Sequence, residues 1–501
     1  MATLKSIKNK YIQTSDGTSL GVSDNSDNIS LLAFKMQAAD SIGKFNMVDG
    51  FSDSYIDATG IDASASTNEN RDSSNYYSGG VSANPTGGTV TTYSSGGVDY
   101  RVHTFTSNGD FVVSTGTANI DFLLVAGGAS GGGKLAGGGG AGGVLHVTGE
   151  STTAATYAAV IGAGGTQTGG ANHRGGAGGN STFKSQTAVG GGGGAAYATF
   201  SGIGGGSGGG GAGRIPAEGG GGGGGGAAGQ PGPTGGSSGT GYGNAGGSGA
   251  NTGGGENRRG GGGGGAGEAG NTDGQSEGGD GVQINIDNNN YYWGGGGGGS
   301  RHRTGGSGPA GLGGGGGGGG TGGGSAGSGG GSAINSGANG SGTNGGDAGA
   351  NTGGGGGGQA SQSDPPSYET GNPGDGGSGI VIVRYVDGAF VSYNNLTLVS
   401  NSVTAAAQPD TADIVATYTN GAGTATINTD IKYYVSRDNG TTYSEATMVS
   451  QGTSGGHSMI SARNIDISGQ PAGTTMRYKV TTHNQSAAKE TRAQAVSLAW
   501  A

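Results

Sequence analysis

One stretch of the chain, residues 127–379, constrains the fold more than any other, because 110 of its 253 residues are glycine. Uninterrupted glycine runs of five to eight residues lie at 190–194, 219–226, 260–265, 294–299, 313–320 and 353–358. Glycine has no Cβ and loses more conformational freedom on folding than any other residue. A stretch with so much glycine cannot bury an ordinary apolar core.

Three physical states can be considered for this stretch. Collagen is excluded, because glycine does not recur at every third position and the chain has only 10 prolines. A flexible linker is the usual state of low-complexity glycine and serine. The third state is a bundle of extended, threefold polyglycine II helices that exchange backbone hydrogen bonds sideways. Such packing requires glycine, because a Cβ facing a neighbour would hold the backbones apart.

The arrangement of the runs favours the ordered bundle over the linker. Runs of five to eight residues each span about 15–25 Å at about 3.1 Å per residue, and the inserts between them differ from one another. Ordering a residue's backbone costs about 1–2 kcal/mol, so nearly every N–H and C=O group of the bundle must be paired. We therefore predict a fully bonded bundle with exposed inserts, in which valine at Gly222 or Gly316 lowers stability sharply.

Short β-type runs flank the glycine-rich stretch. Valine, isoleucine and aromatic residues bounded by glycine and asparagine predict strands at 102–105, 111–113, 122–125, 144–147 and 157–161. A similar run at 380–385, in GSGIVIVRY, has no partner immediately before it. We predict that it pairs with the strand at 122–125. Residues 99–386 would then be one domain, in which a small sheet closes a large insertion.

Residues 387–501 predict a separate β unit. Strands are expected at 396–400, 414–418, 431–437, 458–467, 475–482 and 493–500, with turn signals such as NGAGT and GQPAG between them. Several short strands at this spacing are typical of a β-sandwich.

A motif in this unit, SRDNGTTY from Ser436 to Tyr443, matches the Asp-box pattern S-x-D-x-G-x-T-W/Y. The motif resembles hairpin turns of sialidase-like propellers, where it stabilises the turn and takes no part in catalysis. We expect Asp438 to accept hydrogen bonds from the amides of Gly440 and Thr441. The expected turn residues are Ser436, Asp438, Gly440 and Thr442.

The N-terminal region has a helical pattern. Apolar residues recur at spacings of three and four over residues 28–51, at Ile29, Leu32, Met36, Ala39, Ile42 and Phe45. Such a helix would pack on its own domain or dock another subunit. We assign residues 1–60 to an N-terminal attachment or oligomerisation segment and 61–98 to a loop-rich connector. The chain as a whole is predicted to be mainly β, with one short N-terminal helix.

Composition excludes several classes of protein. The chain has no cysteine, which excludes a disulfide scaffold and thiolate metal sites. A net charge of −10 without a basic tract argues against nucleic-acid binding. No secretory signal begins the chain and no run approaches about 20 apolar residues. We expect a protein that is made and kept soluble in a cytoplasm.

Catalytic motifs find no support in the sequence. Gly128, Gly133 and Lys134 fit G-x-x-x-x-G-K, but Leu135 replaces the hydroxyl residue that would bind magnesium, and glycine replaces the following helix. The six histidines have no metal-ligand spacing, and neither a Ser-His-Asp set nor a carboxylate pair can be argued from spacing. We therefore predict a non-enzymatic protein without cofactor or metal.

The inserts between the glycine runs carry aromatic and basic residues. Tyrosine, tryptophan and arginine are common anchors of recognition surfaces, and rigid scaffolds often present such residues on loops. The alternative is that these aromatics simply cover the bundle. The candidates for receptor contact are Tyr197, Phe200, Tyr242, Arg258, Arg259, Tyr291, Tyr292, Trp293, Arg301, His302, Arg303 and Tyr368.

Several phrases carry a family resemblance. VHTFTSNGDFVV, DFLLVAGGASGGG, YAAVIGAGG and GSGIVIVRY resemble the glycine-rich domain common in bacteriophage tail-fibre and virion appendage proteins. The end unit, from NLTLVSNSVTAAAQP to SLAW, resembles a C-terminal module repeated among fibre-like proteins of marine phages. The segment NISLLAFKMQAADSIGKFNMVDGF has a weaker resemblance of the same kind.

The resemblance implies a virion fibre or adhesin that is trimeric by analogy. Its N-terminal region would join other virion proteins, and its variable loops would bind a host-surface protein or glycan. Alternatives are a structural appendage or decoration protein and, from another class, a polysaccharide depolymerase. This chain differs from short phage adhesins in carrying β-modules on both sides of its bundle. Either the bundle or the C-terminal module could therefore be the distal tip.

Overall fold

The computed structural model describes residues 12–13, 19–20, 37, 42–47, 49–166, 172–213, 222–251, 258–302, 305–321, 324–361 and 371–501. Every secondary-structure element within these residues is a β-strand, and none of them forms a helix able to cross a bilayer. The chain divides into two compact units. The first combines the described residues up to Ser82 with Val391–Ala501, and the second is Ala83–Phe390.

Two sheets build most of the first unit. The smaller sheet has the order β21-β28-β24-β25, with β22 also on β28. Its strands are β21 (Thr397–Val399), β22 (Val403–Thr404), β24 (Ile431–Ser436), β25 (Ser444–Ala446) and β28 (Thr475–Thr482). The larger sheet has the order β26-β27-β23-β29-β4-β3, and β6 joins β29 and β5. Its strands are β3 (Lys44–Met47), β4 (Gly50–Asp53), β5 (Asn70–Arg71), β6 (Tyr77–Ser78), β23 (Thr411–Ala422), β26 (Val449–Ser454), β27 (His457–Asp466) and β29 (Glu490–Trp500).

Side chains from both sheets share one apolar core. Burial alternates residue by residue along β28, as a strand with one buried face requires. Tyr433 and Tyr478 of the smaller sheet lie in the same buried cluster as Phe51 and Leu498 of the larger one. The rings of Phe51 and Tyr478 stack with their centroids 5.6 Å apart. The six strands predicted for residues 387–501 are all present, with ends shifted by a few residues.

The N-terminal helix prediction is wrong at its C-terminal end, where residues 44–47 and 50–51 are strand, whereas Gln37 has helical backbone as predicted. The predicted helix over 28–51 ends in a hairpin of β3 and β4, and Phe51 of β4 lies opposite Leu498 of β29. Pairing with a long strand far along the chain overrides the local helical pattern. Ile29, Leu32, Met36 and Ala39 lie outside the described residues.

The predicted connector over 61–98 also contains regular structure. It holds β5, β6, β7 (Gly80–Ser82) and β8 (Thr89–Ser95). In the first unit, β7 pairs with β20 (Val391–Tyr393). The prediction of loops is therefore wrong here, because these polar segments pair both with neighbouring strands, as β8 does with β9, and with distant strands, as β6 does with β29. The short strands β1 (Ile12–Gln13) and β2 (Ser19–Leu20) pair with each other.

The second unit is organised by an antiparallel sheet with the order β14-β11-β10-β19-β9-β8. Its strands are β8, β9 (Val98–Phe105), β10 (Gly109–Val125), β11 (Val144–Ala159), β14 (Ser238–Tyr242) and β19 (Ile380–Val386). Leu123 of β10 lies opposite Ile382 of β19. The predicted closure of the glycine-rich stretch by pairing of 380–385 with 122–125 is therefore confirmed.

Short hairpins from the glycine-rich stretch cover both faces of this sheet. Phe122 and Leu124 face a cluster that includes Phe183 of the hairpin of β12 (Ser181–Phe183) and β13 (Gln186–Ala188). Leu123 faces the opposite cluster, which includes Trp293 of the hairpin of β17 (Val282–Gln283) and β18 (Tyr292–Trp293). A third hairpin joins β15 (Ala250–Asn251) and β16 (Arg258–Arg259).

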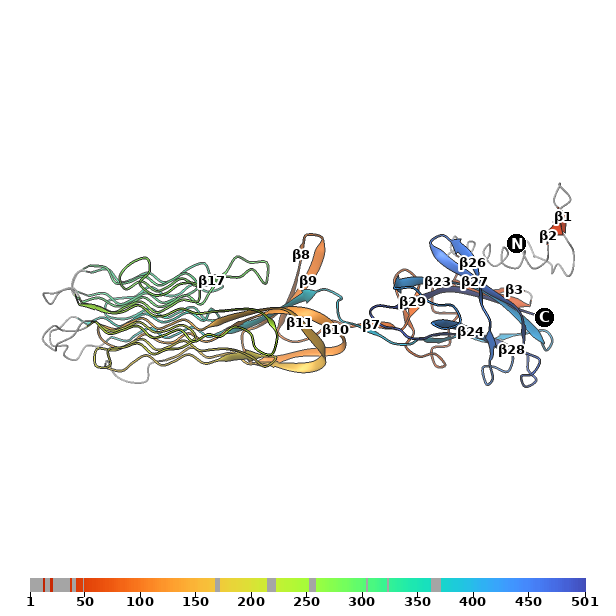
Figure 1. Cartoon of the computed structure of the whole chain (residues 1–501), viewed down its shortest axis with the longest axis horizontal. Helices are drawn as coiled ribbons and strands as arrows, with labels where there is room; N and C mark the ends of the chain where they lie inside the picture. The colour runs from red at the N-terminus through yellow and green to blue at the C-terminus, as the bar shows by residue number, and fades with distance from the viewer. Residues whose placement is uncertain are drawn as a thin grey trace. The chain divides into compact units, whose positions relative to one another are not determined.

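The glycine runs lie side by side as extended segments (Figure 1), and their hydrogen bonds repeat every third residue. In the run 126–133, successive amides donate to three different neighbouring runs in rotation, with N···O distances of 2.9–3.1 Å. The donor–acceptor pairs are Ala126–Gly143, Ala129–Gly140 and Gly132–Gly137; Gly127–Gly179, Ser130–Gly176 and Gly133–His173; and Gly128–Gly377 and Gly131–Gly374. Partner numbers fall as donor numbers rise, so these neighbours run antiparallel.

The carbonyl groups of the same run face three further neighbours. Gly127, Ser130 and Gly133 accept from Gly191, Gly194 and Tyr197; Ala129 and Gly132 accept from Gly356 and Gln359; and Gly128 accepts from Gly165. Six segments therefore surround this run, and each of its N–H groups from 126 to 133 has a backbone partner. Pairing of this kind is what an ordered glycine-rich stretch requires.

The spacing between runs leaves no room for most side chains. A Cβ on Gly131 would lie 2.1 Å from the carbonyl oxygen of Gly357, and one on Gly316 would lie 1.9 Å from that of Gly346. These atoms belong to backbone that its own hydrogen bonds hold in place. Glycine is therefore a packing requirement at these positions, independently of its backbone freedom.

Candidate functional site

The bundle has one end opposite its sheet, and several turns meet there. The run that leaves β10 at Val125 reverses at Lys134 and Leu135, both with positive φ, and returns to β11 at Val144. Around this reversal, Gly133 bonds to His173 and Tyr197, and Leu135 accepts from the amide of Gly213. We call this end the end face, comprising residues 133–136, 172–174, 196–201, 211–213, 258–260, 300–302 and 359–361.

Four of the predicted basic residues meet at the end face, but their exposure differs. The His302 amide donates to the Arg258 carbonyl at 3.0 Å, and Arg259 and Arg301 face each other across an isolated antiparallel bridge. Arg258 and His302 are buried, whereas Arg259 and Arg301 are partly exposed. The burial of Arg258 and His302 argues against their predicted contact with a receptor, which stays a prediction.

Electrostatics distinguish Arg301 from an ordinary surface arginine. Burial lowers the pKa of its guanidinium, and the like charge of Arg259 lowers it further. The Arg301 Nη1 donates to the Gly306 carbonyl at 3.4 Å. Arg259 Nη1 donates to the side-chain oxygen of Gln275.

Tyr197 and Phe200 lie in another turn of the end face, and both are partly exposed. The Phe200 backbone has φ of 60°, a left-handed conformation that is an outlier for a bulky residue. Arg174, which sequence analysis did not single out, donates from Nη2 to the Thr199 carbonyl at 3.1 Å. The only sequence signal for Arg174 was its place in NHR, a short polar insert between glycines.

Trp293 is fully buried and does not belong to an exposed surface. Its Nε1 donates to the Ile284 carbonyl at 3.1 Å, and its ring packs in the cluster that covers one face of the sheet. This burial argues against the predicted contact of Trp293 with a receptor, which stays a prediction. The alternative that aromatic residues cover the protein's own structure describes Trp293 correctly, although the surface it covers is the sheet and not the bundle.

The remaining aromatic candidates lie beside Trp293 or outside the described residues. Tyr291 meets the Trp293 ring edge-on, with centroids 5.8 Å apart, and Tyr292 is partly exposed. Tyr242 of β14 lies opposite Val144 and packs against the same cluster. These residues therefore belong to the sheet and not to the end face. Arg303 and Tyr368 lie outside the described residues.

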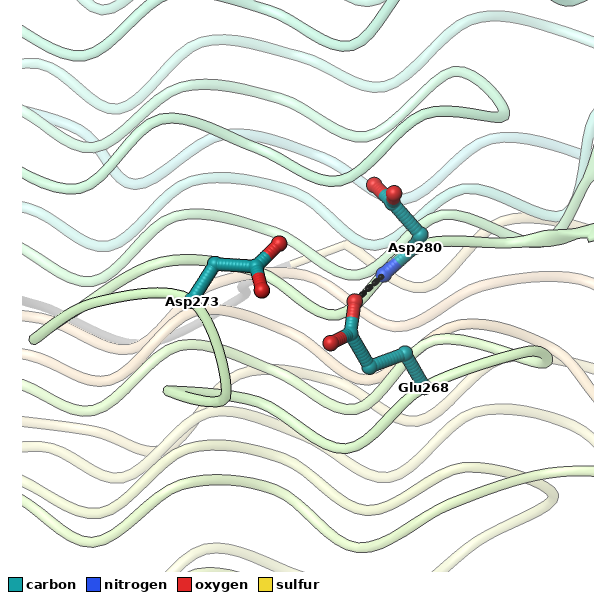
Figure 2. Close-up of side chains that lie close together, drawn as sticks. All are labelled: Glu268, Asp273 and Asp280. Carbon is teal, nitrogen blue, oxygen red and sulfur yellow. Dashed lines mark hydrogen bonds between the residues drawn. The ribbon is translucent and has the colours of Figure 1, made fainter.

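An acidic cluster was missed by sequence analysis. Figure 2 shows the carboxylates of Glu268, Asp273 and Asp280 close together, with ligand oxygens within 4.8 Å of one another. Glu268 Oε2 accepts from the Asp280 amide at 3.4 Å, and Asp280 Oδ1 accepts from the Leu312 amide at 2.7 Å. Burial and repulsion from these three carboxylates raise the pKa of nearby Glu277. Oxygen sets of this kind suit a hard divalent cation, although exposed carboxylates are often grouped without one.

The Asp-box segment forms a tight polar turn. Asp438 accepts from the amide and hydroxyl of Thr442 and from the Ser436 hydroxyl. The Gly440 amide donates to Ser436 Oγ at 2.8 Å and not, as predicted, to Asp438. Burial alone would raise the pKa of Asp438. The hydrogen bonds to its carboxylate have the larger effect, so its pKa lies below the usual value. The four turn residues bond with one another in a way that supports a structural role.

Comparisons with known proteins bear on the second unit. No curated protein matches the chain at a significant level. A family profile described as a glycine-rich domain matches residues 104–311, which extend from β9 into the glycine runs. This part of the chain is therefore similar to a glycine-rich domain.

Proposed function

We propose that the protein is a bacteriophage virion fibre or adhesin that attaches to the host surface without catalysis. The observation that carries the proposal is the end face, where separate turns of a densely hydrogen-bonded scaffold bring aromatic and basic residues to one end of the bundle. Recognition residues are commonly held on loops by rigid elements. A rigid support also reduces the entropy lost on binding.

On this proposal the glycine runs are polyglycine II helices. Hydrogen bonds that rotate among neighbours with a period of three fit a helix with three residues per turn. The two sheets of the first unit, which share one apolar core, would form a β-sandwich. The Asp-box turn would serve that sandwich and not a binding site.

The proposal also assigns the partners and the place of action. Residues 1–60 would attach the chain to other virion proteins, and the chain would assemble as a homotrimer. The end face would contact a host-surface protein or glycan, so that the protein acts on the extracellular particle after synthesis in the host cytoplasm.

A structural virion appendage without receptor binding is the second candidate. The burial of Trp293 and the packing of Tyr242 favour it, because both side chains stabilise the sheet. The two candidates differ in one respect, since only an adhesin needs the exposed side chains of the end face. The aromatic turn at Tyr197 and Phe200 therefore discriminates between them.

Binding of the labelled full chain to a panel of bacterial strains tests the proposal. Phe200→Gly removes the ring and is compatible with the left-handed backbone, so combined with Tyr197→Ala it should leave the fold intact. Tyr292→Ala, near the sheet, is the matched control. We expect the end-face variant to lose binding to strains that the wild type and the control bind. A wild type that binds no strain, or an end-face variant that binds equally well, would favour the structural appendage.

A further inference from the structure

The hairpin of β8 and β9 contains a strand that is left uncovered on both faces and along one edge. β8 is the last strand of its sheet and pairs there with β9. All of its seven residues are exposed except Tyr93, which is partly exposed. Figure 1 shows the hairpin projecting from the side of the sheet. Within the described part of the chain, the outer edge of β8 has no backbone partner.

The turn of this hairpin determines which backbone groups point outward. Gly96 and Gly97 have positive φ of 60° and 80°, as the two central residues of a type I′ turn do. In a hairpin with a two-residue turn, the flanking residues, here Ser95 and Val98, exchange both of their backbone hydrogen bonds. Every second pair along the strands does the same, and the pairs between them point their backbone groups away from each other.

A hydrogen bond on the other side of β9 agrees with this alternation. The Asp99 carbonyl of β9 accepts from the amide of Asp387, which follows β19, at 2.9 Å. The residue opposite Asp99 on β8 is Ser94, so Ser94 points its N–H and C=O groups away from β9. The same holds for Val90 and Thr92. These three residues therefore place backbone donors and acceptors along the outer edge.

Other strand edges of the molecule are protected against a second chain. Charged side chains, short strands and covering groups are the usual protection. β3 carries Lys44, β25 has three residues and carries Glu445, and Lys184 Nζ donates to the Ser151 carbonyl of β11 at 2.7 Å. β8 has no charged side chain, no proline and no register shift against β9. An edge of this kind is a template for a further strand.

The sequence of β8 suits pairing with a second copy of itself. When two copies run antiparallel with Thr92 opposite Thr92, Val90 of each copy lies opposite Ser94 of the other. Residues with outward groups then meet only residues with outward groups, so each outer N–H has a carbonyl opposite it. The chain has a net charge of −10, but β8 contributes none of it. The pairing therefore places no like charges opposite each other, which would destabilise a sheet.

We propose that β8 pairs antiparallel with β8 of a second copy of this chain, joining the two sheets through the backbone groups of Val90, Thr92 and Ser94. The inference goes beyond the proposed attachment function and does not depend on it. The contact is two-fold symmetric, with the same surface on both copies. It does not build the proposed homotrimer but adds copies to whichever assembly the rest of the chain forms.

The mass of the full chain in solution, measured by sedimentation equilibrium, tests this inference. Small interfaces are usually weak, so the measurement extends to about 200 µM protein. We expect the wild type to reach at least about twice the mass of Thr92→Glu. Arg101 lies opposite Thr92 on β9, so this glutamate suits the hairpin of a single chain, whereas two glutamates would face each other in the pair.

Thr156→Glu is the matched control, because Thr156 is exposed on β11 and the variant adds the same charge to the same sheet. It should keep the mass of the wild type. Equal masses of the wild type and Thr92→Glu at every concentration would overturn the inference. An equal loss of mass in both glutamate variants would overturn it as well, because general charge repulsion would then explain the effect.

Cross-linking through a single cysteine tests the register of the pair. The chain has no cysteine, and opposed residues of a hydrogen-bonded pair have Cα atoms about 5.5 Å apart, within the range of a disulfide. Under mild oxidation, Thr92→Cys should form linked pairs of chains, and Thr156→Cys should remain largely unlinked. No linkage at position 92, or equal linkage at both positions, would overturn the inference. Neither experiment uses host cells, so this inference and the attachment function can fail separately.

Discussion

In the first unit, large side chains such as Tyr433, Tyr478 and Leu498 fill the space between two sheets. In the glycine runs of the second unit, backbone atoms fill the equivalent space, and neighbouring runs approach so closely that a Cβ has no room. The stability of the first unit should therefore fall when side-chain atoms are removed. The stability of the second unit should fall when side-chain atoms are added to the glycine runs.

The two tryptophans allow the units to be followed separately. Trp293 lies in the second unit and Trp500 in the first, and the chain has no other tryptophan. Variants that keep only one of them, with phenylalanine replacing the other, report the unfolding of each unit by fluorescence.

The largest effect is expected for side chains added within the runs. In Gly316→Val, the new Cβ would meet the Gly346 carbonyl oxygen at 1.9 Å, and rotation of the side chain cannot relieve contact with fixed backbone. We expect a loss of more than about 3 kcal/mol and no folded second unit. Gly331→Val is the matched control, because nothing lies within 4 Å of its Cβ position. Denaturant unfolding followed by Trp293 fluorescence compares the two, and equal stability of both variants would contradict close packing of the runs.

The second-largest loss of stability is expected in the core of the sheet that closes the glycine-rich stretch. Trp293→Ala removes a tryptophan side chain that is fully buried and should destabilise the second unit by about 3–5 kcal/mol. The first unit should not change. Unfolding of the second unit can be followed by circular dichroism, while the fluorescence of Trp500 reports the unfolding of the first unit. A loss below about 1 kcal/mol would show that Trp293 is not part of the core.

A buried carboxylate gives the first unit a pH dependence. Burial raises the pKa of Asp53 to about 6, against opposing hydrogen bonds from Tyr55 and Tyr478 and the charge of Lys44. Protonation therefore favours the folded state, so the contribution of Asp53 to stability is complete below about pH 4 and is lost as pH rises through 6. A rise in pKa from 3.8 to about 6 corresponds to about 3 kcal/mol.

The variant Asp53→Asn isolates this contribution. It should be more stable than the wild type by up to about 3 kcal/mol above pH 7, and of similar stability near pH 4. The measurement is the difference in unfolding free energy between the two proteins, followed by Trp500 fluorescence at both pH values. A difference that does not depend on pH would argue against a raised pKa.

The smallest effect is expected at the Asp-box turn. Asp438→Ala leaves the Thr442 amide and the Ser436 hydroxyl without their acceptor and should destabilise the first unit by about 1–2 kcal/mol. The second unit and the binding of bacterial cells should be unaffected. Loss of cell binding at unchanged stability would show that the recognition site lies at this turn and not at the end face.

The sequence predicted the closure of the second unit because the strand at 380–385 is apolar and has no local partner. It did not predict that β10 is one strand of 17 residues. Polar and small residues around 114–119 lie at a register shift between Val113 and Thr117, and they hide the continuity of the strand. The hairpin of β3 and β4 was missed because its pairing partner, β29, lies more than 400 residues later in the sequence.

The candidate site was predicted in part. Arg259, Arg301, Tyr197 and Phe200 were selected by residue type, and the structure brings them to one end of the bundle. Trp293 was selected for the same reason but is buried, because the closing sheet has two apolar faces and each needs a cover. Residue type alone cannot distinguish exposed candidates from buried ones, since the direction of each insert depends on the order in which the runs pack.

The central claim is that backbone hydrogen bonds hold the glycine runs in a fixed, ordered array. Hydrogen exchange of the amides in residues 126–143, in the full chain under native conditions, measures those bonds directly. The account predicts that these amides exchange orders of magnitude more slowly than an unfolded chain, with protection comparable to that of β10 and β19. Exchange at the rate of an unfolded chain would contradict it and would show that the stretch is a flexible linker.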